Sequence, residues 1–293
     1  MIASAPGKVI VFGEHSVVYG KHAVVSAIDL RCYAKAEKRS GFRIISQFGE
    51  TGLDFDGHHS YISHAIRRFS EIRKIEGALI EVRSSVPPAS GLGSSASVTV
   101  AVLGALNAEF DTDLSQDEIF ELARNVELDV QGIGSGTDPF VVTFGGSWVI
   151  PEKKRFETRL NFDVVDTKQK SVTSEMVRRV RELKERYPDI VNPVLDAMDS
   201  IALKGAEALE KNDAERVSEL FRMNQSLLRA IGVSTPLIDR IIAGIEEEGY
   251  AAKITGAGGG GCIITTGRGD FKIGLSGEGV RVEDFEDWRE SDN

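Results

Sequence analysis

The sequence contains few cysteines and no long hydrophobic run. Only two of its 293 residues are cysteine, Cys32 and Cys262, and both lie in apolar stretches far from one another. This usage indicates reduced, buried thiols in a cytosolic protein and excludes a disulfide framework. No segment approaches the roughly 18 consecutive apolar residues that a membrane-spanning helix needs. The N-terminal segment has no basic region or cleavage site before its first strand, so a signal peptide is not expected.

Positive charge is also in short supply. The chain has 45 acidic and 35 basic residues, which gives a formal net charge of −10. A duplex nucleic acid partner is therefore not expected, because binding one favours a basic face. An anionic ligand would have to be attracted locally, by loops and a few lysines. Apolar residues make up 41% of the chain, which is ordinary for a globular protein with a core. We expect a cytoplasmic binder or enzyme with no membrane partner.

The order of the expected elements indicates an α+β chain with a boundary near residues 150–160. The first part contains predicted strands at 9–12, 23–25, 31–36 and 78–83, and helices after residue 97 and from 116 to about 129. The second contains a predicted strand at 159–166, helices at 174–186, 193–211, 214–231 and 236–248, and strands on either side of a glycine run. Residues 140–150 resemble a strand pair or bend, and the acidic segment 282–293 a frayed end. We divide the chain into domains 1–155 and 156–293.

The segment PPASGLGSSAS, residues 87–97, connects an apolar strand to an apolar helix. GLGSSA matches the dinucleotide-binding pattern, but two prolines separate the strand from the glycines, and Asp111 lies in a polar loop rather than at a strand end. A Rossmann site is therefore disfavoured, and a Walker A motif is excluded because no Gly-Lys-Ser/Thr follows. Two interpretations stay open for this loop alone. It is either a tight turn with Ser94 as a cap, or an anion site at a helix N-terminus whose serine hydroxyls can also reach Mg²⁺.

Three other segments are candidates for chemistry. GAGGGG at 256–261 lies between apolar strands, where four consecutive glycines suggest backbone that approaches something closely, although a flexible hairpin is the alternative. PGKVIVFGEHSVVYG at 6–20 places Lys8 at the start of a strand and Glu14 and His15 at its end, although each of these could be an ordinary surface or structural residue. ELDVQGIGSGTDP at 127–139 offers Glu127 to a metal and Asp138 to a substrate hydroxyl, or a turn with local hydrogen bonds alone.

These segments carry a resemblance to a known family. PGKVIVFGEHSVVYG, PPASGLGSSAS and KITGAGGGGC occur in the order and spacing of the three signature motifs of the GHMP small-molecule kinases. The likeness covers at least residues 3–265, and the first motif is most similar to the branch that phosphorylates mevalonate. It implies a two-domain GHMP kinase fold, with a ribosomal protein S5 domain 2-like N-terminal part and a ferredoxin-like C-terminal part. The chain departs from the branch at Gln131, where histidine is common, and at Ser16, where alanine is frequent.

The resemblance also implies roles for individual residues. Asp138 matches the catalytic base and Lys8 its catalytic partner, while Ser95 and Glu127 match the ligands of Mg²⁺. The residues that match the ATP-binding motifs are Pro88, Ala89, Ser90, Gly91, Leu92, Gly93, Ser94, Ser95, Ala96, Gly258 and Gly259. Those that match acceptor-site positions are Lys8, Glu14, His15, Asp138, Thr173 and Gly258, with Thr173 hydrogen-bonded to Asp138. A homodimer is expected by analogy with the family.

Three other functions compete with ATP-dependent phosphorylation of mevalonate. The first is a kinase of the same family for phosphomevalonate, homoserine, shikimate or a sugar. The second is a ligand sensor without turnover, which is disfavoured because Lys8, Glu127 and Asp138 are all present. The third is a nicotinamide-dependent oxidoreductase, which the context of the glycine loop already disfavours.

Overall fold

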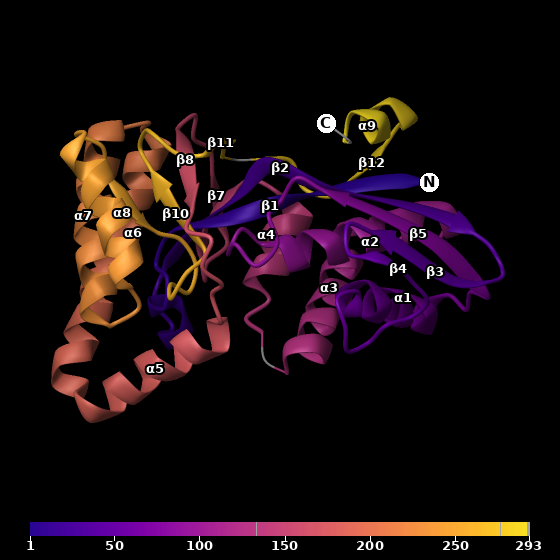
Figure 1. Cartoon of the computed structure of the whole chain (residues 1–293), viewed down its shortest axis with the longest axis horizontal. Coiled ribbons are helices and arrows are strands. Elements are labelled where there is room, and N and C mark those ends of the chain that lie inside the picture. The colour runs from indigo at the N-terminus through magenta and orange to yellow at the C-terminus, as the bar shows by residue number, and fades with distance from the viewer. Residues whose placement is uncertain (133, 276, 292–293) are drawn as a thin grey trace.

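Two β-sheets organise the computed structural model, which describes residues 1–132, 134–275 and 277–291 (Figure 1). Within these residues, the larger sheet has eight strands in the order β12-β1-β2-β5-β3-β4, with β6 paired to β2 and β7 to β6. The smaller sheet has four strands in the order β11-β8-β10-β9. This mixture of sheets and helices agrees with the predicted α+β class.

The larger sheet is mostly antiparallel, and only the pairing of β3 with β5 is parallel among the described strands. Its strands are β1 (Ile2–Phe12), β2 (Ala23–Lys38), β3 (Gly41–Ser46), β4 (Gly49–Thr51), β5 (Gly77–Ser84), β6 (Ser147–Ile150), β7 (Lys154–Phe156) and β12 (Arg281–Glu283). β2 runs without a break through the two strands predicted at 23–25 and 31–36. No glycine or proline interrupts this stretch, so the chain stays extended.

Four helices belong to the N-terminal part: α1 (Ser60–Ile72), α2 (Ser94–Phe110), α3 (Gln116–Gln131) and α4 (Thr137–Phe144). α2 packs directly on β1, β2 and β5, and α1 and α3 pack on α2. α3 begins with the predicted capping box, in which Ser115 and Glu118 bond each other's backbone N–H groups. The strand or bend predicted at 140–150 is wrong for its first half, because Phe140–Phe144 continue the helix that begins after Gly136.

The C-terminal part combines the smaller sheet with four further helices. Its strands are β8 (Asn161–Asp166), β9 (Ala252–Ile254), β10 (Cys262–Thr265) and β11 (Phe271–Gly274), and its helices are α5 (Thr173–Arg186), α6 (Pro188–Glu210), α7 (Ala214–Ala230) and α8 (Pro236–Glu247). α8 begins at the predicted cap, where Thr235 accepts from the N–H of Ile238. α6 differs from its prediction, because it begins at Pro188 and contains Pro193 in its interior.

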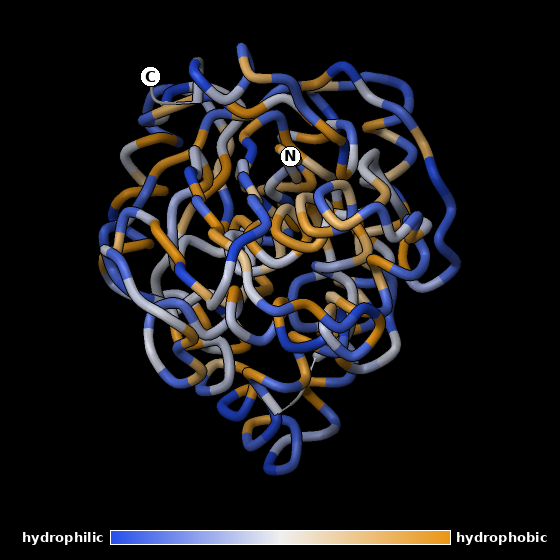
Figure 2. Tube along the Cα trace, turned by 90° about the vertical axis from the view of Figure 1, so that its right-hand side faces the viewer, coloured by the Kyte–Doolittle hydropathy of each residue, from blue (hydrophilic) through white to orange (hydrophobic). Residues whose placement is uncertain are grey.

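The hydrophobic core consists of several clusters of buried residues, one of which is shared by the two sheets. One cluster of buried residues lies between the larger sheet and α1–α3. A second joins Val9 and Phe12 of β1 to Phe162 of β8 and Phe221 of α7, so the N- and C-terminal parts pack on each other directly. Figure 2 shows a long hydrophilic stretch along the right-hand margin and hydrophobic stretches in the middle of the molecule. Among the described residues, no helix has both the length and the apolar character for crossing a bilayer.

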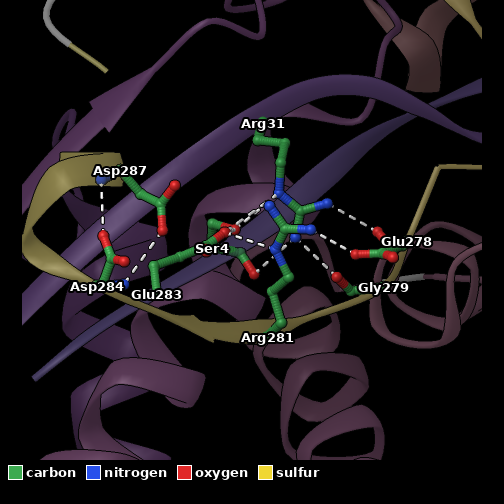
Figure 3. A network of polar contacts seen from close by, with 8 residues as sticks. All are labelled: Ser4, Arg31, Glu278, Gly279, Arg281, Glu283, Asp284 and Asp287. Atoms are coloured by element: carbon green, nitrogen blue, oxygen red, sulfur yellow. Dashed lines mark hydrogen bonds and ion pairs between the residues drawn. The ribbon is translucent and has the colours of Figure 1, made fainter. Parts of the chain in front are cut away.

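The C-terminal segment returns to the larger sheet (Figure 3). β12 pairs with β1, so that Ile2 lies opposite Glu283, and α9 (Phe285–Glu290) follows. Trp288 of α9 is 4% exposed and stacks on Arg83, whose guanidinium carbon lies 4.0 Å from the ring centroid. The expectation of a frayed acidic end is therefore wrong for residues 282–291. This segment also crosses the predicted domain division, since it follows the second sheet in sequence but packs on the first.

Arg31 of β2 fixes this segment in place. Its side chain is buried, and its guanidinium donates to Ser4 Oγ at 2.7 Å and to the carbonyls of Glu278 and Gly279 at 2.8 and 2.7 Å. Figure 3 shows these groups converging on Arg31 from β1 and from the returning segment. A single buried cation thus satisfies acceptors from two parts of the chain that are far apart in sequence.

We expect Arg31→Met to lower the free energy of unfolding by about 3–5 kcal/mol, because it leaves these buried acceptors unpaired. Urea denaturation followed by circular dichroism measures this loss. Arg43→Met is the control, since Arg43 and its partner Glu50 are 44% and 51% exposed, and such surface pairs contribute at most about 1 kcal/mol. Equal unfolding midpoints for the two variants would contradict the assignment.

Candidate active site

Lys8 and Asp138 form an ion pair between β1 and α4. Lys8 Nζ lies 3.1 Å from Asp138 Oδ2, and the lysine side chain is 5% exposed while that of the aspartate is 32% exposed. Asp138 belongs to the first turn of α4, where the helix dipole favours a negative charge. The pair therefore joins a buried cation to a carboxylate that still reaches solvent. Such a carboxylate is accessible to a reacting group.

The loop 87–93 passes directly over Lys8 before α2 begins. The backbone N–H of Lys8 donates to the Leu92 carbonyl at 2.9 Å. A Cβ at Gly93 would lie 2.6 Å from Lys8 Cγ, and Gly93 also has a φ of +78°. Glycine is therefore required here for two independent reasons. Because the first N–H groups of α2 have no partner within the helix, the loop presents a helix N-terminus beside the lysine and is suited to an anion.

Ser95 and Glu127 face each other across a small cavity. Its lining residues are Tyr61, Ser95, Ala96, Thr99, Ala123, Glu127 and Pro139. Glu127 Oε2 accepts a hydrogen bond from the Gly136 N–H at 3.1 Å. Burial, followed by the negative charge of Asp138, raises the pKa of Glu127 to about 7. Because nearby groups only partly offset this unfavourable environment for its negative charge, Glu127 is suited to bind a cation.

The donor set fits Mg²⁺ when phosphate oxygens complete its coordination. A hydroxyl and a carboxylate are hard oxygen ligands, and proteins commonly hold Mg²⁺ with one or two carboxylates plus substrate phosphates. In the described part of the chain, no cluster of three His, Cys, Asp or Glu residues could hold a metal without such help. The predicted ligands Ser95 and Glu127 therefore line one cavity, next to the N-terminal end of α2.

The glycine loop 256–261 lies against both other motifs. Thr255 Oγ1 donates to the carbonyl of Ile10 at 3.0 Å, and the N–H of Cys262 donates to the carbonyl of Ser90 at 3.0 Å. The predicted positions Gly258 and Gly259 have φ values of +76° and +71°. A Cβ at Gly258 would lie 2.4 Å from the Val233 carbonyl oxygen. Crowding and backbone conformation together account for glycine here, and the three motifs meet in one place.

The predicted acceptor residues occupy different environments. His15 is 6% exposed, and its Nε2 lies 2.8 Å from the Ala257 carbonyl, which can only accept; Nε2 is therefore the protonated nitrogen. Burial lowers the pKa of His15, so the imidazole is neutral at pH 7. Thr173 begins α5 and is exposed, and among the described residues no hydrogen bond joins it to Asp138. The structure therefore does not support the predicted Thr173 contact.

Glu14 lies deeper than predicted. Its side chain is 0% exposed, and it forms an ion pair with Lys253 of β9, which is likewise 0% exposed. Sequence reasoning did not identify Lys253 as a site residue. A lysine between Ala252 and Ile254 in an apolar strand is the signal that could have found it, because a buried cation requires an acidic partner.

Tyr61 was also missed. Its hydroxyl accepts from Gln131 Nε2 at 2.8 Å, and it lines the same small cavity as Ser95, so a contact between α1 and α3 borders one of the predicted metal ligands. Gln131 is the position at which the sequence departs from the expected histidine. No pattern around Tyr61 in the sequence distinguishes it from other amphipathic helix positions.

Comparison with known proteins agrees with this geometry. The family model for the GHMP kinases N terminal domain matches residues 60–146, and that for GHMP kinases C terminal matches residues 206–270. A mevalonate kinase of Archaeoglobus fulgidus is 54% identical over 289 residues, covering 97% of this chain and all of that protein. The chain belongs to the GHMP kinases.

Solved structures give the same result for the fold of this GHMP kinase. A crystal structure of a mevalonate kinase aligns with a TM-score of 0.82 at 29% identity, covering 95% of this chain and 100% of the other. The mevalonate kinase of L. major, crystallised in complex with R-mevalonate, aligns with a TM-score of 0.78 at 25% identity, covering 98% and 88%. The predicted GHMP kinase fold and the assignment as a kinase are confirmed.

We expect Glu127→Gln to raise the melting temperature of the ligand-free kinase by a few degrees at pH 8 and by much less at pH 5. The pKa of Glu127 is about 7 in the folded state against an ordinary 4.5, so the folded wild type holds this proton more tightly. Its stability therefore falls as pH rises from about 4.5 to about 7, and the neutral amide avoids this loss. Differential scanning fluorimetry at both pH values measures the difference.

Glu121→Gln in the same helix is the matched control, because the Glu121 side chain is 57% exposed. Its melting temperature should follow that of the wild type at both pH values. A rise of equal size at pH 5 and pH 8 in the Glu127 variant would show that ionisation of this group is not the cause.

Proposed function

We propose that this kinase transfers the γ-phosphoryl group of ATP to the C5 hydroxyl of mevalonate, producing 5-phosphomevalonate for isoprenoid precursor synthesis in the cytoplasm. The observation that carries phosphoryl transfer is the Lys8–Asp138 pair, 3.1 Å apart, beside the N-terminus of α2. The choice of acceptor is supported by the name of the 54% identical relative and by the R-mevalonate in the aligned L. major structure. A cytoplasmic location agrees with two buried, unpaired cysteines.

The chain offers the triphosphate two sets of backbone groups. The N–H groups at the start of α2, with loop 88–96, bind the phosphates through hydrogen bonds and the positive end of the helix dipole. The glycine loop 256–261 approaches from the other side, and Gly258 and Gly259 allow close backbone contact because they have no side chain. This local arrangement accounts for anion binding by a chain whose formal charge is −10.

Ser95 and Glu127 are the residues that hold Mg²⁺ in this proposal. When bound, the ion neutralises charge on the β- and γ-phosphates. Glu127 serves as a ligand only after it loses its proton, and its pKa of about 7 places that loss near neutral pH. The Gly136 N–H orients Glu127 through a hydrogen bond, and Tyr61 lines the cavity beside Ser95.

Asp138 accepts the proton of the acceptor hydroxyl as that oxygen attacks phosphorus. Its side chain remains 32% exposed, whereas Lys8 beneath it is nearly covered. Lys8 stabilises negative charge that develops on the hydroxyl oxygen. Because phosphoryl transfer has a loose transition state, positioning and charge stabilisation supply most of the catalysis. His15 lies at the end of β1 and is the neutral hydrogen-bonding group assigned to the acceptor.

Asp138→Asn should lower kcat by about 10²–10⁴-fold, the range expected for loss of a general base, while the variant still binds ATP. Coupled ADP-release assays and isothermal titration calorimetry measure the two properties separately. Asp111→Asn is the control, because Asp111 is 87% exposed at the end of α2 and plays no part in the site. Turnover of the Asp138 variant at the wild-type rate would remove the general-base role.

The acceptor is tested by measuring ADP release from Mg²⁺–ATP with mevalonate, phosphomevalonate, homoserine, shikimate and galactose in separate reactions. Turnover with mevalonate alone is the expected result. Turnover with a different alcohol would retain the nucleotide site and Asp138 but overturn the assigned acceptor. Binding of ATP without turnover on any of the five would contradict the proposed reaction.

A further inference from the structure

Glu14 and Lys253 form a fully buried ion pair at the junction of the two sheets. Both side chains are 0% exposed. Asn224 of α7 donates to the second carboxylate oxygen of Glu14 at 3.1 Å, and Lys253 Nζ also donates to the Ile254 carbonyl at 2.6 Å. The rings of Phe12 and Phe221 lie 6.0 and 5.6 Å from the same ammonium. These contacts surround Glu14 with protein groups and leave none of its side-chain surface accessible to an acceptor.

Stability alone does not account for such a pair. Removing two charges from water is costly, and apolar residues of similar size in place of a buried pair often leave stability unchanged or improve it. Burial lowers the pKa of Lys253, whereas the nearby carboxylate of Glu14 acts in the opposite direction and favours the charged form of the lysine. The pair therefore contributes chiefly by holding together the two segments that it connects.

Those segments are the first and third motifs. Glu14 directly precedes His15, which has a φ of +60° and contacts the carbonyl of Ala257 in the glycine loop. Lys253 lies three residues before Gly256, where that loop begins. Between them, Thr255 Oγ1 bonds the carbonyl of Ile10 in β1. The ion pair is thus the charged member of a row of contacts that joins the loop after β1 to the loop after β9.

We propose that Glu14 and Lys253 are positioning residues, which hold His15 and the glycine loop 256–261 in one fixed arrangement, and that Glu14 does not contact the acceptor. The catalytic consequence rests on the proposed function, whereas the structural consequence for the glycine loop does not. A loop that shifts by about 1 Å can cost about 100-fold in rate, because the phosphoryl group and the hydroxyl lose their alignment.

The test is a double-mutant cycle of Glu14→Gln, Lys253→Met and the double variant. Each single variant should lower kcat/KM for the acceptor by about 100-fold at saturating ATP, since each breaks the same connection. The kcat/KM of the double variant should be no lower than that of the less active single variant, because the effects of residues that act as one unit are not additive. Hydrogen exchange of residues 256–261 in the ligand-free protein should become about tenfold faster in all three, as expected for a less protected segment.

Arg31→Met is the matched control, because it also removes a buried cation but lies in the C-terminal contact of Figure 3. It should lower the melting temperature without a selective change in exchange at 256–261 or in kcat/KM. Loss of activity in the Glu14 variant but not in the Lys253 variant would overturn the proposal in favour of direct acceptor contact. If these variants melt at a lower temperature but keep the wild-type kcat/KM at temperatures well below thermal unfolding, the pair is purely structural and the proposal is overturned.

Glu14→Asp keeps the proposal testable if the other single variants do not fold. It retains the charge but withdraws the carboxylate by one methylene, so kcat/KM should fall by about tenfold while the protein stays folded. Wild-type kinetics and exchange in this variant would overturn the proposal. The exchange measurement needs no acceptor. If the wild-type enzyme does not phosphorylate mevalonate, the proposed function is refuted, but the hydrogen-exchange result for residues 256–261 still tests the positioning role. The kinetic comparison would then use the alcohol that the wild type does phosphorylate.

Discussion

The ion pair between Lys8 and Asp138 is the contact on which the rest of the site depends. Lys8 is almost fully buried, so its charge requires a partner, and Asp138 supplies it from the first turn of α4. The lysine side chain also lies against the backbone at Gly93, which fixes the path of the phosphate loop. Burial, followed by the charge of Asp138, then raises the pKa of Glu127. One buried cation therefore determines the positions or charges of the proposed base, anion loop and metal ligand.

β1 explains how segments so far apart in sequence reach this cation. Ala3 and Ala5 belong to the core beneath α1–α3, whereas Val9 and Phe12 belong to the core shared with the smaller sheet. Lys8 lies where the strand passes from one core to the other. Figure 1 shows β1 and β2 running from the N-terminal helices toward the C-terminal sheet. Rigid strand backbone, rather than a flexible linker, therefore carries Lys8 between the two parts.

Sequence patterns predicted the features that depend on local chemistry. The glycine loops, the capping box at Ser115 and the family motifs with Lys8 and Asp138 could be found because each depends on neighbouring residues. The helix at Phe140–Phe144 was missed because a short apolar run has no period that separates helix from strand. The Glu14–Lys253 pair was missed for a different reason. Its partners are 239 residues apart, and no local pattern encodes a contact across that separation.

The return of β12 to β1 has a consequence for the newly made chain. Ser4 meets Glu283 across 279 residues, so this edge of β1 has no partner strand until residues 281–283 have been synthesised. Unpaired strand edges are templates for pairing with other chains, and contacts of such long sequence separation form slowly. The larger sheet is therefore completed only after synthesis of residues 281–283, and until then this edge of β1 stays open to pairing with other chains.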